Sequence, residues 1–243
     1  MNWWHRLRNK FIKRIPYPDR FIMRLPSSTI GSGMLHEGNI YLMDHAIRHM
    51  PPGGYVLEIG SWGGLSTNLL LHLMKKYHRQ EVFLGCDPWK YSYQDDEVGE
   101  PDFIDGREDI SRKEYMEYIR QGFIDSVSLF NRSKLPYTFQ MTSDEFYAQM
   151  DKKTSITDLF GRSMVPDKGI SFCYIDGNHT YDFVKRDFEN VDRYLIDNGL
   201  ILFDDSMDGD QFGSAHFMKE IKQNPSYKVI KKNPNYFQDV TVL

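Results

Sequence analysis

The chain lacks several features that would assign it to a specialised class of protein. It holds only two cysteines, Cys86 and Cys173, among 243 residues, which excludes a disulfide framework or a cysteine-rich zinc site. No apolar run approaches the roughly 20 residues that a membrane-spanning helix needs. The net charge of −4 gives no bulk attraction to nucleic acid. We therefore expect a cytoplasmic protein with reduced, buried thiols and no nucleic-acid partner.

The glycines also miss a common pattern. An apolar run over 55–59 ends at Gly60, and Gly63 and Gly64 follow, which is not the G-x-G-x-x-G spacing of dinucleotide-binding turns. A strand, a glycine turn and a helix start leave backbone N–H groups free to face a ligand. Glu58 lies inside the apolar run, where a lone carboxylate is costly unless function requires it. The pattern favours a ligand-binding turn, with a purely structural turn as the alternative.

Apolar strands and amphipathic helices alternate from residue 55 onward. This order predicts a single α/β domain with a doubly wound, mostly parallel, seven-stranded sheet covered by helices on both faces. The last two strands are separated by three residues, which predicts a C-terminal antiparallel hairpin. Gly199 is expected to end the helix before it. The predicted strands are 55–60, 81–87, 137–141, 170–176, 199–204, 226–231 and 235–242, and the predicted helices are 38–49, 65–77, 112–130, 143–150, 181–196 and 213–223.

Residues 1–37 form a basic N-terminal segment ahead of the domain at 38–243. Its first 24 residues carry seven Lys or Arg against one acid, with tryptophan and isoleucine among them. Such a segment can pack on the domain or on a second subunit, which would make the protein a homo-oligomer. It can also lie on an anionic membrane surface, as a peripheral contact. We favour packing or self-association, and disorder is the third alternative.

Residues 90–136 form an insertion between the second and third predicted strands. Its stretch 94–109 carries eight acids against Arg107 alone. A solvated acidic loop is the default interpretation. The alternative is a lid, because loops beyond the carboxyl ends of parallel strands are where ligands bind in such sheets.

Four acids follow predicted strands. Asp87 ends the second strand, where an acid grips a ribose through its hydroxyls, although it could instead be a turn residue before proline. Asp176 ends one later strand, and Asp204 and Asp205 end the next. Carboxylates crowded at one sheet edge repel one another unless a cation lies among them, and hard oxygen ligands suit Mg²⁺. A solvated turn for Asp176 and a helix cap for Asp205 are the alternatives.

Three motifs in combination carry a family resemblance: E-I-G-S-W-G-G-L-S-T at 58–67, I-D-G-N-H-T-Y at 175–181 and L-I-L-F-D-D at 200–205. They resemble class I, Rossmann-like S-adenosylmethionine (SAM) dependent methyltransferases, and within them the macrocin-type, metal-dependent sugar O-methyltransferases. The resemblance implies SAM and a divalent cation held by Asp176, Asp204 and Asp205. It also implies His179 as a catalytic base and Ser143 at the adenine edge. The cofactor-binding residues expected on this basis are Glu58, Gly60, Ser61, Gly64, Ser66, Asp87, Ser143 and Asp176.

Methyl transfer to an alcohol requires that the hydroxyl lose its proton as it attacks the sulfonium methyl. Histidine accepts protons near neutral pH, so His179 suits that task. A histidine that only packs beneath the following helix is the alternative. His216, on a helix after the fifth strand, is a second candidate base, and Asp176 could be the base if no metal binds. The sequence therefore predicts an O-methyltransferase of a sugar or other small hydroxylated metabolite. An aminopropyltransferase-like enzyme and a non-catalytic SAM- or glycan-binding module are the alternatives.

Overall fold

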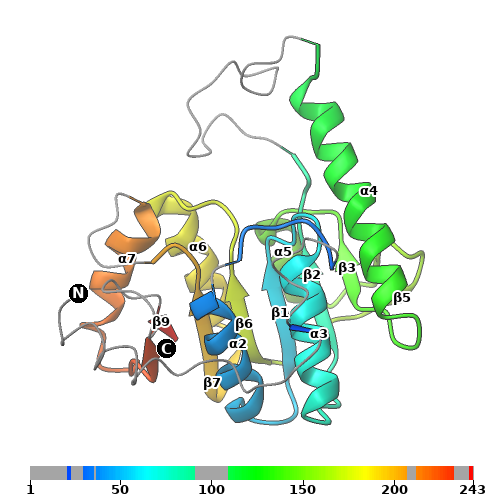
Figure 1. The fold of residues 1–243 in the computed structure, drawn as a ribbon. Helices are drawn as coiled ribbons and strands as arrows, with labels where there is room; N and C mark the ends of the chain where they lie inside the picture. Colours follow the sequence, from blue (N-terminus) through cyan, green and yellow to red (C-terminus); the bar gives the residue numbers. More distant parts are fainter. Residues whose placement is uncertain are drawn as a thin grey trace, which may run out of the picture.

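A computed structural model of the chain describes residues 21–22, 30–35, 37–90, 109–206, 212–232 and 241–242 (Figure 1). The described helices are α2 (Glu37–His49), α3 (Leu65–Lys76), α4 (Arg112–Phe130), α5 (Ser143–Lys152), α6 (Tyr181–Asp192) and α7 (Gly213–Ile221). The described strands are β1 (Tyr55–Ile59), β2 (Phe83–Cys86), β3 (Tyr137–Phe139), β4 (Ile156–Thr157), β5 (Ser163–Met164), β6 (Ile170–Ile175), β7 (Leu195–Phe203), β8 (Lys231–Lys232) and β9 (Thr241–Val242).

The main sheet has seven strands in the order β3-β2-β1-β6-β7-β9-β8. The five strands from β3 to β7 pair in parallel, and β9 pairs antiparallel with both β7 and β8. These pairings confirm the predicted fold class and the antiparallel C-terminal pair. Because β1 lies between β2 and β6, the strand order reverses at β1. Ligands bind at such a reversal, outside the carboxyl ends of the strands.

Helices cover both faces of the sheet (Figure 1). Successive strand residues point to opposite faces, so Val56 and Tyr174 pack with α2 and α3. Leu57 and Cys173 pack on the opposite face with α5, α6 and α7. Both cysteines are buried free thiols, as expected. The two apolar layers hold the carboxyl ends of β1, β6 and β7 at one edge.

Two predicted boundaries are wrong. The helix predicted over 181–196 ends at Asp192, and Leu195 already belongs to β7. Leu195 pairs with Ile170 and Leu200 pairs with Phe172, so the residues between form a bulge rather than a helix end. Asn198 takes the left-handed turn there, with φ 61°, and Gly199 lies inside the strand rather than capping the helix.

Of the strand predicted over 226–231, only Lys231 is in strand conformation. Of the strand predicted over 235–242, Thr241–Val242 forms β9 and the remainder lies outside the described residues. The two-stranded antiparallel sheet of β4 and β5 was not predicted. Its strands have two residues each, which is too short for an alternating pattern to register in the sequence.

The predicted insertion contains a helix with the expected bounds 112–130, α4, which packs beside α3. The Ser126 hydroxyl donates to the Gly63 carbonyl at 3.2 Å, so α4 supports the glycine turn. The acidic stretch 94–108 and most of the basic N-terminal segment lie outside the described residues. Of that segment, Ile22 is buried in the core beside α2 and α3 and Phe21 stacks on His72 of α3. None of the described helices is long and apolar enough to cross a membrane.

Candidate active site

The turn after β1 brings the backbone of two strand ends into close contact. Gly60 has φ 84°, and a Cβ atom there would lie 2.0 Å from the carbonyl oxygen of Asp176, so only glycine fits. Gly64 takes φ 89° as the residue before α3. The segment 30–35 lies against this turn, because Ser32 forms β-bridges with Gly63 and Gly64. The turn is thus a close-packed backbone junction that begins α3.

Glu58 is fully buried on β1 beside the start of α3. Its Oε2 atom accepts hydrogen bonds from Ser61 at 2.9 Å and from Thr67. Its Oε1 atom is buried and has no hydrogen-bond partner among the described residues. Burial raises the pKa of Glu58 to about 7, against hydrogen bonds from Thr67, Ser66 and Ser61 that lower it. Ser61, predicted to touch the cofactor, therefore turns its hydroxyl to Glu58, and Ser66, also predicted there, is buried at the start of α3.

Asp87, at the end of β2, binds the backbone of the glycine turn. Its Oδ2 atom accepts from the Ser61 and Trp62 amides at 2.9 and 3.0 Å, and its Oδ1 atom accepts from the Trp89 amide at 2.7 Å. Trp62 and Trp89 both have positive φ, 44° and 45°, which is strained for bulky residues. The Trp89 indole donates to the Trp62 carbonyl at 2.9 Å. Asp87 thus clamps the turn, and burial raises its pKa.

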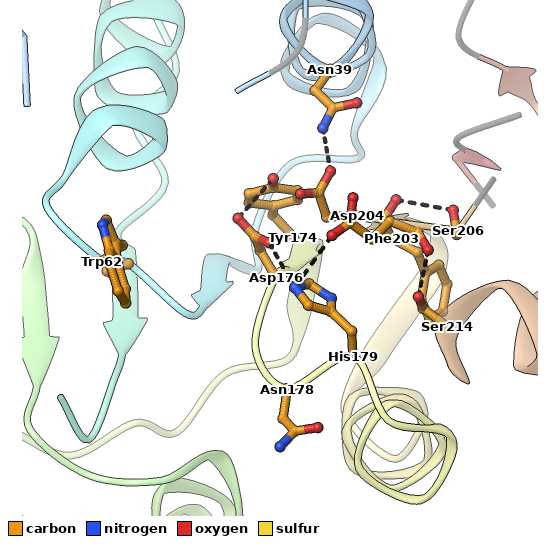
Figure 2. Close-up of polar contacts among 12 residues, drawn as sticks. Asn39, Trp62, Tyr174, Asp176, Asn178, His179, Phe203, Asp204, Ser206 and Ser214 are labelled. Atoms are coloured by element: carbon orange, nitrogen blue, oxygen red, sulfur yellow. Dashed lines mark hydrogen bonds and ion pairs between the residues drawn. The ribbon is translucent and has the colours of Figure 1, made fainter. Parts of the chain in front are cut away.

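The ends of β6 and β7 bring Asp176 and Asp204 together (Figure 2). Tyr174 donates its hydroxyl to Asp176 at 3.0 Å, and Asn39 of α2 donates its amide to Asp204. Burial raises the pKa of Asp176 well above its usual value, and the charge of Asp204 and a hydrogen bond between the two carboxyl groups raise it further. Two carboxyl groups in such contact favour a proton between them, or a cation in its place.

His179 lies beside this pair and points toward it (Figure 2). Its Nε2 atom is 3.5 Å from Asp205 Oδ2 and 4.0 Å from Asp176 Oδ1. The side chain is 23% exposed, so it is open to a ligand at the sheet edge. The structure thus brings His179 to Asp205 and Asp176, and Asp204 lies beside Asp176.

The three acids fit a divalent cation only in part. Asp176 and Asp204 have the hard oxygen atoms and the close approach that such an ion requires. The Asp205 side chain is 44% exposed and turns to His179. Within the described ranges, no three His, Cys, Asp or Glu side chains are already grouped as a metal site.

Ser143, predicted at the adenine edge, is the first residue of α5, after the capping residue Thr142. Its hydroxyl donates to Asp187 of α6. Asp187 is 3% exposed, and burial raises its pKa to about 7. This contact joins the starting turn of α5 to α6.

Sequence reasoning missed Asn39, Trp62, Tyr174 and Asp187. Asn39 comes from a helix far earlier in the chain, and only the fold brings it to Asp204. Asp187 had a signal, because it is a lone acid on the apolar side of the 181–192 helix pattern, between Val184 and Val191. A buried acid on an apolar face requires a partner or a function.

Residues 57–206 match a family described as a methyltransferase domain. Similar solved structures include CalS11, a TDP-rhamnose 3'-O-methyltransferase of calicheamicin biosynthesis, which is 15% identical with a TM-score of 0.56, covering 98% of this chain and 91% of that one. The O-methyltransferase NovP is 11% identical with a TM-score of 0.55, covering 86% and 80%. The S-adenosylhomocysteine-bound methyltransferase PaMTH1 of Podospora anserina is 11% identical with a TM-score of 0.56, covering 98% and 92%.

No curated protein sequence matches the chain. At the identities above, the solved structures show that the fold is shared. The family match spans more than half of the 243 residues and includes the glycine turn, Asp87, Asp176 and the two acids that end β7. The chain therefore belongs to this methyltransferase family, and it is an enzyme with the class I methyltransferase fold.

Proposed function

We propose that the protein transfers a methyl group from SAM to a hydroxyl of a sugar or another small hydroxylated metabolite. The observation that carries this proposal is the meeting of the glycine turn with Asp176, Asp204 and His179 at the strand-order reversal of a methyltransferase fold. CalS11 and NovP, whose names describe O-methyltransferases, share this fold. The carboxylates and imidazole suit a hydroxyl acceptor, because its proton must leave.

For SAM we propose the sheet edge from the glycine turn to Ser143. PaMTH1, which shares the fold, is bound to the product of SAM. Two features of the turn support SAM there: Gly60 leaves no Cβ atom in the way, and Gly64 begins a helix that has no side-chain cap. Glu58, Ser61 and Ser66 support the turn indirectly, because Ser61 donates a hydrogen bond to Glu58 and Ser66 lies in the surroundings of the same carboxyl group. Asp87 retains one Oδ1 lone pair for a ribose hydroxyl after its three amide contacts.

For the divalent cation, Mg²⁺ in the first instance, we propose Asp176, Asp204 and Asp205 as ligands. The raised pKa of Asp176 beside Asp204 supports this, because a cation can replace the shared proton. Asp205 would have to turn from His179 to complete the set. When bound, such an ion would lower the pKa of an acceptor hydroxyl.

The chain's own residues suffice to describe the proton transfer that we propose. The acceptor oxygen attacks the methyl carbon in line with sulfur, the C–S bond breaks, and S-adenosylhomocysteine leaves. The hydroxyl proton passes to the imidazole of His179. As long as Asp205 faces that ring rather than a cation, with its Oδ2 atom 3.5 Å from Nε2, its carboxylate stabilises the imidazolium that results. Asp176 is the alternative base.

The test is methyl transfer from labelled SAM across hydroxylated sugars and phenols, with and without chelator. His179→Ala should lower kcat by about 10²- to 10⁴-fold, the usual contribution of a general base. His216→Ala removes the second candidate base, an exposed histidine of α7, and should leave activity unchanged. Full activity of His179→Ala would show that His179 only packs beneath the helix and is not the base. Full activity in chelator would contradict the proposed cation.

We also infer self-association through the basic N-terminal segment and a cytoplasmic location. The burial of Ile22 and the stacking of Phe21 on His72 support packing of that segment on the domain. The homo-oligomer, the peripheral membrane contact and the lid over 90–136 stay predictions.

A further inference from the structure

Asp187 is a buried acid that the proposed chemistry does not use. It lies midway along α6, and its Oδ1 atom accepts the hydroxyl hydrogen of Ser143 at the start of α5. Its Oδ2 atom lies near Gly177, the residue directly after Asp176: a Cβ atom on Gly177 would be 3.5 Å from Oδ2. Asp187 therefore lies at the junction of α5 and the end of β6, which is the Ser143 end of the proposed SAM site, where the family resemblance implies the adenine ring.

The other groups around Asp187 do not compete with Ser143 for its carboxylate. The charge of Asp187 acts on Cys86 of β2, Cys173 of β6 and Tyr147 of α5, and all three are buried with pKa values raised well above their usual range. They stay uncharged near neutral pH. Arg186, its neighbour on α6, is bound to Asp144 at 2.9 Å.

A serine hydroxyl carries one hydrogen and two lone pairs. When that hydrogen points to Asp187, Oγ of Ser143 can only accept a further hydrogen bond. We propose that Asp187 makes Ser143 an obligate acceptor, and that this selects a purine with a 6-amino group over one with a 6-oxo group. Adenine presents N–H donors at that position, whereas hypoxanthine presents a carbonyl oxygen that would face the serine lone pairs. Asp187 is thus a positioning residue for nucleobase specificity, and the inference rests on the proposed SAM site.

The test is calorimetric binding of S-adenosylhomocysteine and S-inosylhomocysteine, which differ at this group of the purine, at pH 8. The wild type should bind the adenosyl compound about 10- to 100-fold more tightly, the scale of one hydrogen bond gained against one unpaired group. Asp187→Leu removes the acceptor and keeps the branched shape of the side chain, so Ser143 can donate to the 6-oxo group. The ratio should then fall to within a few-fold of unity.

Ser143→Ala should lower the ratio equally, and the double variant should lower it no further, because the two residues act as one unit. Asp192→Leu is the matched control on the same helix, since Asp192 binds Tyr227 instead, and its ratio should equal that of the wild type.

The other outcomes of these binding measurements lead to different conclusions. If Asp187→Leu lowers the ratio and Ser143→Ala does not, Asp187 contacts the base directly and the proposal is overturned. An unchanged ratio in both variants also overturns it. If Asp187→Leu does not fold, Ser143→Ala with an unchanged ratio still decides against the proposal. No binding of either compound to the wild type would instead refute the proposed SAM site.

Discussion

Glu58 should destabilise the folded protein above neutral pH, and Glu58→Gln should remove that cost. The carboxyl is fully buried, Oε1 has no partner in the described part of the chain, and burial raises its pKa from 4.5 to about 7. A raised pKa means that the folded state binds the proton more tightly than the unfolded state. The stability that this proton contributes is fully present below pH 4.5 and is lost as the pH rises through 7.

The size of the effect follows from the shift. A difference of 7 minus 4.5, at about 1.4 kcal/mol for each pKa unit, gives about 3 kcal/mol at pH 8. Gln keeps an oxygen for Ser61 and Thr67 but places an unpaired NH₂ group at the Oε1 position, which costs about 1 kcal/mol. We expect Glu58→Gln to raise the unfolding free energy by about 2 kcal/mol at pH 8 and to change it by less than about 0.5 kcal/mol at pH 5, where Glu58 is already largely ionised in the unfolded state.

The assay is urea-induced unfolding at both pH values. Glu189→Gln, which neutralises an exposed glutamate of α6, is the control and should change stability by less than about 0.5 kcal/mol at either pH. Asp187, with a pKa also raised to about 7, should leave a residual loss of stability between pH 5 and pH 8 in the variant. Equal destabilisation of Glu58→Gln at both pH values would refute the argument that Glu58 carries a burial cost.

Two further variants test the contacts around the glycine turn and the acid pair. Asp87→Asn replaces one accepting oxygen with a donor that faces backbone N–H groups. It should therefore lower the unfolding free energy by about 2–4 kcal/mol and weaken SAM binding about tenfold or more. Unchanged stability in urea unfolding would show that the contacts of Asp87 with the turn are dispensable. Asn39→Ala removes the donor that orients Asp204, so kcat should fall about 10- to 100-fold with SAM affinity unchanged. The control is Asp44→Asn, which changes a buried acid on the same helix that binds Tyr77 and should lower stability alone. An equal loss of SAM affinity in Asn39→Ala would contradict the positioning role of Asn39.

The fold followed from the sequence because its strands and helices are long enough to show their periods. The alternation predicted the parallel sheet, and Gly60 was recognisable because a strand, a glycine and a helix start stand together. The boundary at Leu195 was missed because its apolar side chain suits both the stripe of α6 and the start of β7, and only pairing with Ile170 decides between them.

The acids at the strand ends were also predictable, because parallel strands deliver their carboxyl ends to one edge. Their partners were not, since Asn39 is 165 residues from Asp204 and hydrogen-bond partners at that distance leave no local pattern. The role of Asp87 in binding the turn amides likewise required the backbone geometry, since the sequence suggested only a ribose contact or a turn residue before proline.

The central claim is that this sheet edge binds SAM and transfers its methyl group to a hydroxyl. The most direct measurement incubates the wild type and Asp204→Ala with methyl-labelled SAM and a panel of hydroxylated sugars and phenols, and quantifies O-methylated product and SAM binding in parallel. We predict labelled methyl ether and an equal amount of S-adenosylhomocysteine from the wild type, and SAM binding without product from Asp204→Ala. Product formation at the wild-type rate by Asp204→Ala, or no SAM binding by the wild type, would contradict the account.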